Sequence, residues 1–172
     1  MLESRHGWTG ICVEADPWFF AQLRRNRSCV CVQACLDGEN GQISFTPAGA
    51  TGGIVDSDTD NHLPQDHRML TLQARRLQDV LDEHRAPAVI DFLSLDVEGA
   101  EWRILRHFPF DRYRFRLIMI ERPSSLLHAH LQSLGYLHVG EQGGDEIYCH
   151  GGEPSLLARA AGILKGGHPG MS

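Results

Sequence analysis

The segment at residues 88–106, AVIDFLSLDVEGAEWRILR, constrains the fold more than any other part of the chain. It opens with a nearly continuous apolar run, which is typical of an interior strand buried on both faces of a parallel sheet. Asp96 and Glu98 follow at the expected end of this strand, and Gly99 allows a sharp turn into an amphipathic helix. Because ligands bind off the carboxyl ends of strands in open α/β sheets, the two acids are candidate site residues. Alternatively, they only cap the helix and favour its positive end.

Strands and helices alternate along the rest of the chain, which predicts an α/β fold with a doubly wound, mostly parallel sheet. The other predicted strands cover residues 9–14, 28–36, 41–46, 70–73, 115–121, 136–139 and 146–149. Further helices are expected at residues 17–26, 77–84, 125–134 and 155–164. We therefore predict one domain over residues 1–150 and a tail over residues 151–172, in which a short helix precedes a disordered end.

Three of the predicted strands end in acids: Glu14, then Asp96 with Glu98, then Glu121. Since parallel strands end at the same edge of a sheet, we expect these carboxylates to converge along one rim. A carboxylate after an early strand can accept both hydroxyls of a ribose, which makes Glu14 a candidate nucleotide ligand. The alternative is that Glu14 only helps Asp16 to cap the following helix.

Composition limits the class of partner. The chain has 172 residues, of which 42% are hydrophobic, and its net charge of −6 disfavours nucleic acid and anionic membranes as partners. It contains no apolar run of about 18 residues and no signal peptide pattern, so a membrane span and export are not expected. Its five cysteines lack metal-ligand spacing, which favours reduced thiols and a cytoplasmic location over a zinc site.

A competing motif lies in the loop after residue 47. Asp56-Ser57-Asp58 and Asp58-Thr59-Asp60 both match the DxD pattern that binds a metal ion in many glycosyltransferases. Such matches arise easily in an acidic, glycine-rich loop, so a solvated surface loop is the alternative interpretation.

Four blocks of the sequence resemble the FkbM family of methyltransferases that depend on S-adenosyl-L-methionine. The blocks are TGICVEADPWFFAQLRRNR, HRMLTLQARRLQDVL, IDFLSLDVEGAEWRILRHFPFDRYRFRLIMIERP and LGYLHVGEQGGDEIYCH. The resemblance implies a Rossmann-like class I methyltransferase fold, with strands in the order 3-2-1-4-5-7-6. It also implies methyl transfer, usually to a hydroxyl oxygen, here of a small-molecule or sugar acceptor.

The resemblance assigns roles to the acids. Glu14 would hold the cofactor ribose, and Asp37 would lie near the adenine edge. Asp96 and Glu98 would face the methionine portion and the acceptor pocket. Asp96, Glu98 and Glu121 would form the catalytic set, which orients the acceptor, removes its proton and offsets the positive charge of the sulfonium. No metal site is predicted, although a divalent ion on Asp96 is an alternative.

The family's glycine-rich first block has no counterpart in this sequence. That block normally brings backbone N–H groups to the cofactor and supplies the central strand, between the strands at residues 10–14 and 90–95. We therefore expect two unpaired strand edges, and self-association through them, because unpaired backbone groups are costly. The chain is then a fragment, receives the strand from a partner, or closes up without it. A catalytically inactive or truncated module with the same fold is the alternative function.

Overall fold

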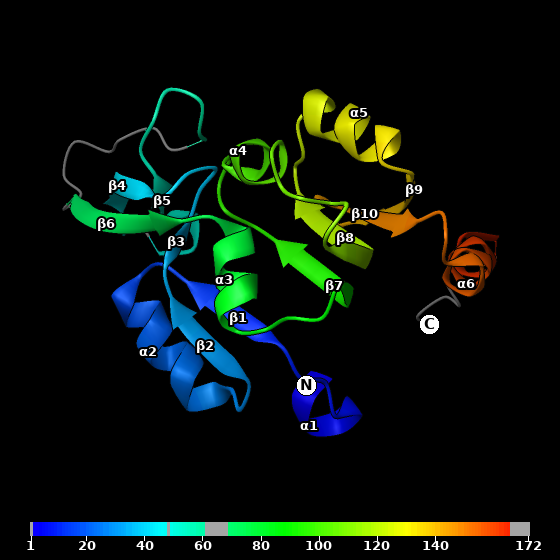
Figure 1. The fold of residues 1–172 in the computed structure, drawn as a ribbon, viewed down its shortest axis with the longest axis horizontal. Helices are drawn as coiled ribbons and strands as arrows, with labels where there is room; N and C mark the ends of the chain where they lie inside the picture. Colours follow the sequence, from blue (N-terminus) through cyan, green and yellow to red (C-terminus); the bar gives the residue numbers. More distant parts are fainter. Residues whose placement is uncertain (1, 48, 61–68, 166–172) are drawn as a thin grey trace, which may run out of the picture. The chain divides into compact units, whose positions relative to one another are not determined.

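The structure is a computed structural model that describes residues 2–47, 49–60 and 69–165 (Figure 1). The chain divides into two compact units, Met1–Arg85 and Ala86–Ser172. The predicted disordered end at residues 166–172 lies outside the described residues.

The first unit contains two small sheets. Its elements are α1 (Leu2–His6), β1 (Ile11–Glu14), α2 (Pro17–Asn26), β2 (Val30–Gln33), β3 (Cys35–Leu36), β4 (Gly41–Thr46), η1 (Gly49–Thr51), β5 (Gly53–Ile54), β6 (Leu70–Arg75) and α3 (Leu77–Glu83). β1 pairs in parallel with β2. The second sheet has the order β3-β6-β4-β5, in which β3 and β6 are parallel and β4 is antiparallel to both of its neighbours.

The helix predicted at residues 17–26 is confirmed as α2. Asp16 caps it, because its Oδ1 accepts the backbone N–H groups of Trp18 at 2.7 Å and Phe19 at 3.2 Å. Pro17 occupies the first helical position, where a missing N–H does no harm. The cap and the proline together fix where the helix begins.

The single strand predicted at residues 28–36 is wrong, since the segment forms β2 and β3 in two different sheets. Ala34 still donates its backbone N–H to the carbonyl of Glu14, at 3.2 Å, and the chain then changes partner. Cys35 and Leu36 pair with Ala74 and Arg75 of β6. A continuous apolar run does not reveal where its hydrogen bonds pass from one strand to another.

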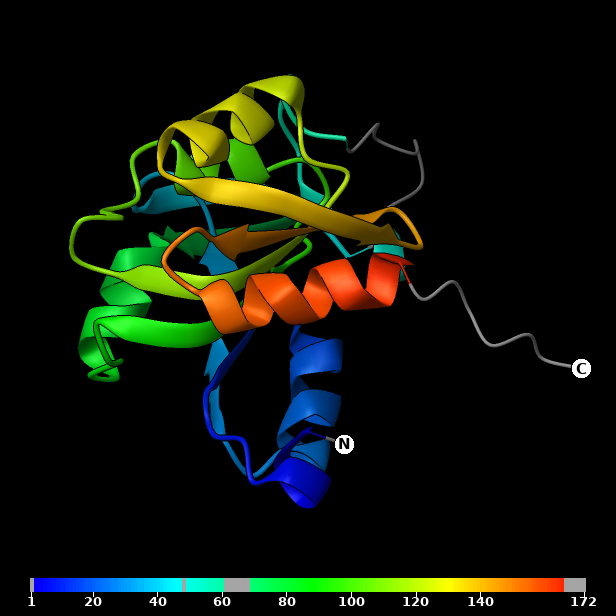
Figure 2. The same cartoon turned by 90° about the vertical axis from the view of Figure 1, so that its right-hand side faces the viewer.

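The second unit is built on one four-stranded sheet. Its elements are β7 (Val89–Leu95), α4 (Glu101–Leu105), β8 (Arg114–Glu121), α5 (Ser125–Ser133), β9 (Tyr136–Gln142), β10 (Asp145–His150) and α6 (Pro154–Lys165). The strand order is β7-β8-β10-β9, with β7 parallel to β8 and β10 antiparallel to both of its neighbours. Both α5 and α6 contact β9 (Figure 2).

The prediction that residues 90–95 form an interior strand buried on both faces is wrong for the described residues. β7 lies at the end of its sheet, pairs there only with β8, and has Leu95 as its one fully buried residue. In the same described part of the chain, β1 pairs only with β2. An apolar run reports the hydrophobicity of a strand's two faces and not whether a neighbour lies along each edge. In the described residues, β1 and β7 thus each pair with a strand along one edge only.

The predicted α/β class is confirmed, but the described residues do not form one doubly wound, mostly parallel sheet. They form three sheets, in which three strand pairs are parallel and four are antiparallel. No helix in the described residues is long and apolar enough to cross a membrane.

Candidate functional site

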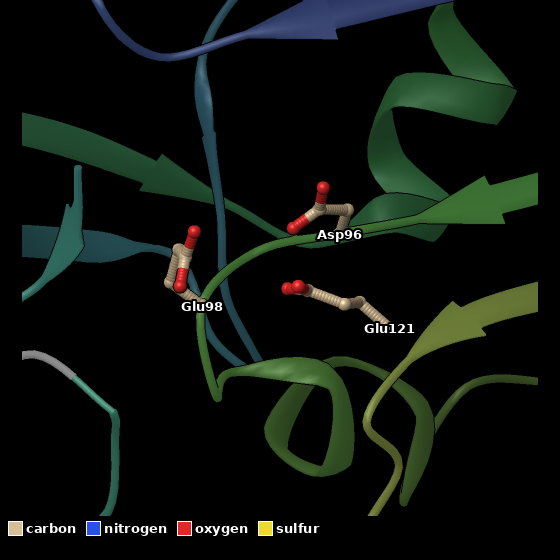
Figure 3. Close-up of side chains that lie close together, drawn as sticks. All are labelled: Asp96, Glu98 and Glu121. Carbon is tan, nitrogen blue, oxygen red and sulfur yellow. The ribbon is translucent and has the colours of Figure 1, made fainter. Parts of the chain in front are cut away.

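Three carboxylates meet where β7 and β8 end (Figure 3). Asp96 follows the last residue of β7, Glu98 comes two residues later, and Glu121 is the last residue of β8. The strands are parallel and Leu95 is paired with Ile120, so they end side by side. One carboxylate oxygen from each acid lies within 4.8 Å of the others. The structure thus brings together the three residues predicted to be catalytic, which we call the acid cluster.

The turn after β7 aims Glu98 into the acid cluster. Glu98 has a φ of +54° and Gly99 a φ of +96°, so a residue with a side chain adopts the left-handed region that glycine favours. Glu101 holds this turn, because its buried Oε1 accepts the backbone N–H groups of Val97 at 3.1 Å and Gly99 at 3.3 Å. These bonds offset part of the backbone strain at Glu98.

Arg122 supplies a positive charge to the acid cluster. Its Nη2 lies 3.2 Å from Oε2 of Glu98 and 3.1 Å from Oε2 of Glu121. Sequence reasoning missed this residue, although its position offered a signal. Arg122 directly follows the acid that ends β8 and precedes Pro123, so it had to lie at the same sheet edge.

The electrostatics of the acid cluster single out Asp96. Desolvation, a hydrogen bond to Glu121 and repulsion from Glu121, Glu98 and Asp145 raise the pKa of Asp96 to about 6. Because Asp96 is solvent-exposed, desolvation has a limited effect on its pKa, and repulsion from the neighbouring carboxylates is the main cause of the increase. Asp145, which sequence reasoning also missed, comes from β10 and is paired with Glu121. Asp96 is therefore a stronger base than an ordinary aspartate.

The predicted nucleotide ligands, Glu14 and Asp37, lie in the first unit. Oε1 of Glu14 accepts the backbone N–H of Asp16 at 2.7 Å, so the alternative capping role is present in the structure. A carboxylate has two oxygens, and this bond does not prevent Glu14 from binding a ribose hydroxyl. Asp37 is only 4% exposed, and its Oδ1 accepts the backbone N–H of Gly38 at 2.6 Å. Its carboxylate is therefore poorly accessible to an adenine. Both roles stay predictions.

The DxD segment forms an exposed turn. Oδ1 of Asp56 accepts the backbone N–H of Ser57 at 2.7 Å, and the hydroxyl of Thr59 donates to the carbonyl of Ile54, also at 2.7 Å. These local hydrogen bonds are those of a surface turn, which favours the solvated-loop interpretation over a metal site.

Clustered carboxylates suit a positively charged organic group, and hard metal ions also prefer oxygen ligands. In this acid cluster the guanidinium of Arg122 already lies against two of the three acids. We assign no metal ion to it. The arrangement is suited to binding a cationic group next to a carboxylate that can take up a proton.

Comparison with known families identifies the chain. The family described as the Methyltransferase FkbM domain matches residues 1–142 of the 172, a span that contains the whole acid cluster. No curated protein and no solved structure matches the chain. The match covers well over half of the sequence, and the chain therefore belongs to the FkbM methyltransferase family.

Proposed function

We propose that this protein transfers a methyl group from S-adenosylmethionine to a hydroxyl oxygen of a small molecule or sugar. The observation that carries the proposal is the convergence of Asp96, Glu98 and Glu121 at the ends of β7 and β8 in a member of a methyltransferase family. The reaction needs a site that tolerates a sulfonium beside a group that can accept a proton.

The strand order supports a class I methyltransferase fold. The order β7-β8-β10-β9, with β10 antiparallel, corresponds to the 4-5-7-6 part of the order 3-2-1-4-5-7-6. The parallel pair β1 and β2 corresponds to strands 2 and 3. In this correspondence β7 is the fourth strand and β8 the fifth, and the acid cluster lies off their carboxyl ends.

The acids present fit the cationic end of S-adenosylmethionine, which supplies an electrophilic methyl group on a positively charged sulfur. Glu98 and Glu121 offset that charge, since repulsion among these carboxylates is relieved when a cation lies near them. Glu14 is assigned to the ribose and Asp37 to the adenine edge on the strength of the family resemblance. Burial makes Asp37 the weaker of the two assignments.

Asp96 takes the proton of the acceptor hydroxyl. Its pKa is raised to about 6, close to the operating pH, where a general base combines the deprotonated form with useful basicity. Methyl transfer is an in-line displacement, so the remaining task of the site is to orient the acceptor oxygen toward the methyl carbon.

Calorimetry with S-adenosylhomocysteine tests the proposal. We expect the chain to bind this ligand and Glu14→Gln to weaken binding by about tenfold, because one charged hydrogen-bond acceptor to the ribose is lost. Glu39→Gln is the matched control, since Glu39 is an exposed glutamate of the same unit, and it should bind like the wild type.

A nucleotide sugar with Mn²⁺ is titrated in parallel to test the DxD alternative. Binding of the nucleotide sugar without binding of S-adenosylhomocysteine would replace the methyltransferase proposal with glycosyl transfer. Absence of binding by both ligands would also contradict the proposal.

A further inference from the structure

The guanidinium of Arg122 lies against two of the three acids of the acid cluster. A single nitrogen of Arg122 reaches both Glu98 and Glu121, at 3.2 Å and 3.1 Å, whereas Asp96 in its protonated form can donate a hydrogen bond to Glu121. The side chains of Glu98 and Glu121 are only 14% and 27% exposed, and that of Arg122 is 55% exposed. The ion pairs therefore join partly buried carboxylates to a cation at the solvent boundary, where screening is incomplete.

The backbone of Arg122 is held next to the acid cluster. Arg122 has a φ of +41°, in the left-handed region that residues with side chains rarely adopt. Its backbone N–H donates to the carbonyl of Gly144 at 3.1 Å, in the turn between β9 and β10. This hydrogen bond holds the backbone of Arg122 beside the acid cluster, and the ion pairs with Glu98 and Glu121 place its guanidinium there.

We infer that Arg122 is a positioning residue, which orients Glu98 and Glu121 and supplies a positive charge beside them. Asp96 is then the carboxylate that takes the proton of the acceptor. This inference deepens the proposed function and rests on it. Arg122 itself contacts the glutamates and acts on Asp96 through them.

The charges that face Asp96 predict how removal of Arg122 changes the pH at which Asp96 loses its proton. Glu98 comes from its own turn, Glu121 from β8 and Asp145 from β10, and all three oppose its ionisation. The single positive charge of Arg122 lies against two of these carboxylates and offsets part of their negative charge. Without the guanidinium, Asp96 faces uncompensated carboxylates, so its deprotonation should require a higher pH.

The test is a pH titration of the Asp96 carboxyl carbon by NMR in protein labelled with ¹³C-aspartate, with the signal assigned through Asp96→Asn. We expect Arg122→Gln to raise the titration midpoint by about one pH unit, a tenfold gain in proton affinity. Arg122→Lys keeps the charge and should move the midpoint less. Arg106→Gln removes an exposed arginine of the same unit, at the end of α4, and should leave the midpoint unchanged.

Failure of the inference can be told from failure of the proposed function, because the titration needs no cofactor. A wild-type midpoint in Arg122→Gln would overturn the inference even if the protein transfers methyl groups. A second readout is the pH dependence of kcat/KM, which reports the free protein and whose acidic limb should move to higher pH in Arg122→Gln by the same amount as the NMR midpoint. If Arg122→Gln instead binds S-adenosylmethionine more tightly with no change in either pH readout, Arg122 competes with the cofactor and is not a positioning residue.

Discussion

Asp96→Asn should lower kcat for methyl transfer by roughly 10²- to 10⁴-fold, the range expected when a general base is removed. The asparagine keeps the size of the side chain and cannot take up the acceptor proton. In the wild type, kcat/KM should fall as the pH drops below about 6, since protonated Asp96 is inactive as a base and its pKa in the free protein is raised to about 6. This acidic limb should be missing from whatever rate Asp96→Asn retains.

The rate is measured as transfer of the tritium-labelled methyl group from S-adenosylmethionine to a panel of sugars and hydroxylated small molecules. Asp91→Asn is the matched control, because Asp91 lies on β7, the strand that Asp96 follows, its side chain is 75% exposed, and it pairs with Arg116 at 3.4 Å. Asp91→Asn should keep the wild-type rate and pH dependence. Similar rates for Asp96→Asn and the wild type would rule out Asp96 as the base.

Tyr136→Phe should reduce the free energy of unfolding by about 2–3 kcal/mol, because it leaves two buried backbone groups without a partner. The hydroxyl of Tyr136 accepts the N–H of Phe115 at 3.1 Å and donates to the carbonyl of the same residue at 3.0 Å. The ladder between β8 and β10 reaches only as far as Leu117 and Cys149. Phe115 lies beyond the end of that ladder, and the hydroxyl of Tyr136 takes the place of a strand partner for its backbone. Burial also raises the pKa of Tyr136 to about 12, which keeps the hydroxyl protonated and able to donate.

Urea denaturation followed by circular dichroism measures the loss. Tyr148→Phe is the control: its hydroxyl donates to Glu146 at 2.8 Å and lies 3.0 Å from Nδ1 of His128, two side chains that water can reach. Since water can replace that hydroxyl as the partner of Glu146 and His128, Tyr148→Phe should reduce the free energy of unfolding by less, about 1 kcal/mol. Equal losses in the two variants would show that the backbone of Phe115 does not depend on Tyr136.

Local signals in the sequence predicted much of the fold and the position of the site. Asp16 and Pro17 mark the start of α2, and Leu77, Val80 and Leu81 share one face of α3, where all three are buried. The acids after β7 and β8 were found because parallel strands place their carboxyl ends at one edge. These features depend on residues close in sequence or on a general rule of sheet topology.

Features that depend on distant partners escaped prediction. The division of residues 28–36 between β2 and β3 is decided by Glu14 on one side and β6 on the other. The role of Arg122 depends on the unusual backbone of Glu98 and on a hydrogen bond to Gly144, neither of which leaves a pattern in the sequence. Hydrogen bonds between segments far apart in the chain, and not local propensity, determined these outcomes.

Whether the acid cluster recognises a sulfonium is tested most directly by calorimetry with S-adenosylmethionine and S-adenosylhomocysteine, which differ by one methyl group and one positive charge. The double variant Glu98→Gln/Glu121→Gln should weaken binding of S-adenosylmethionine by about tenfold more than binding of S-adenosylhomocysteine, because only the first ligand carries the charge that the two glutamates offset. Equal losses for the two ligands, or no loss for either, would contradict a site built around the acid cluster.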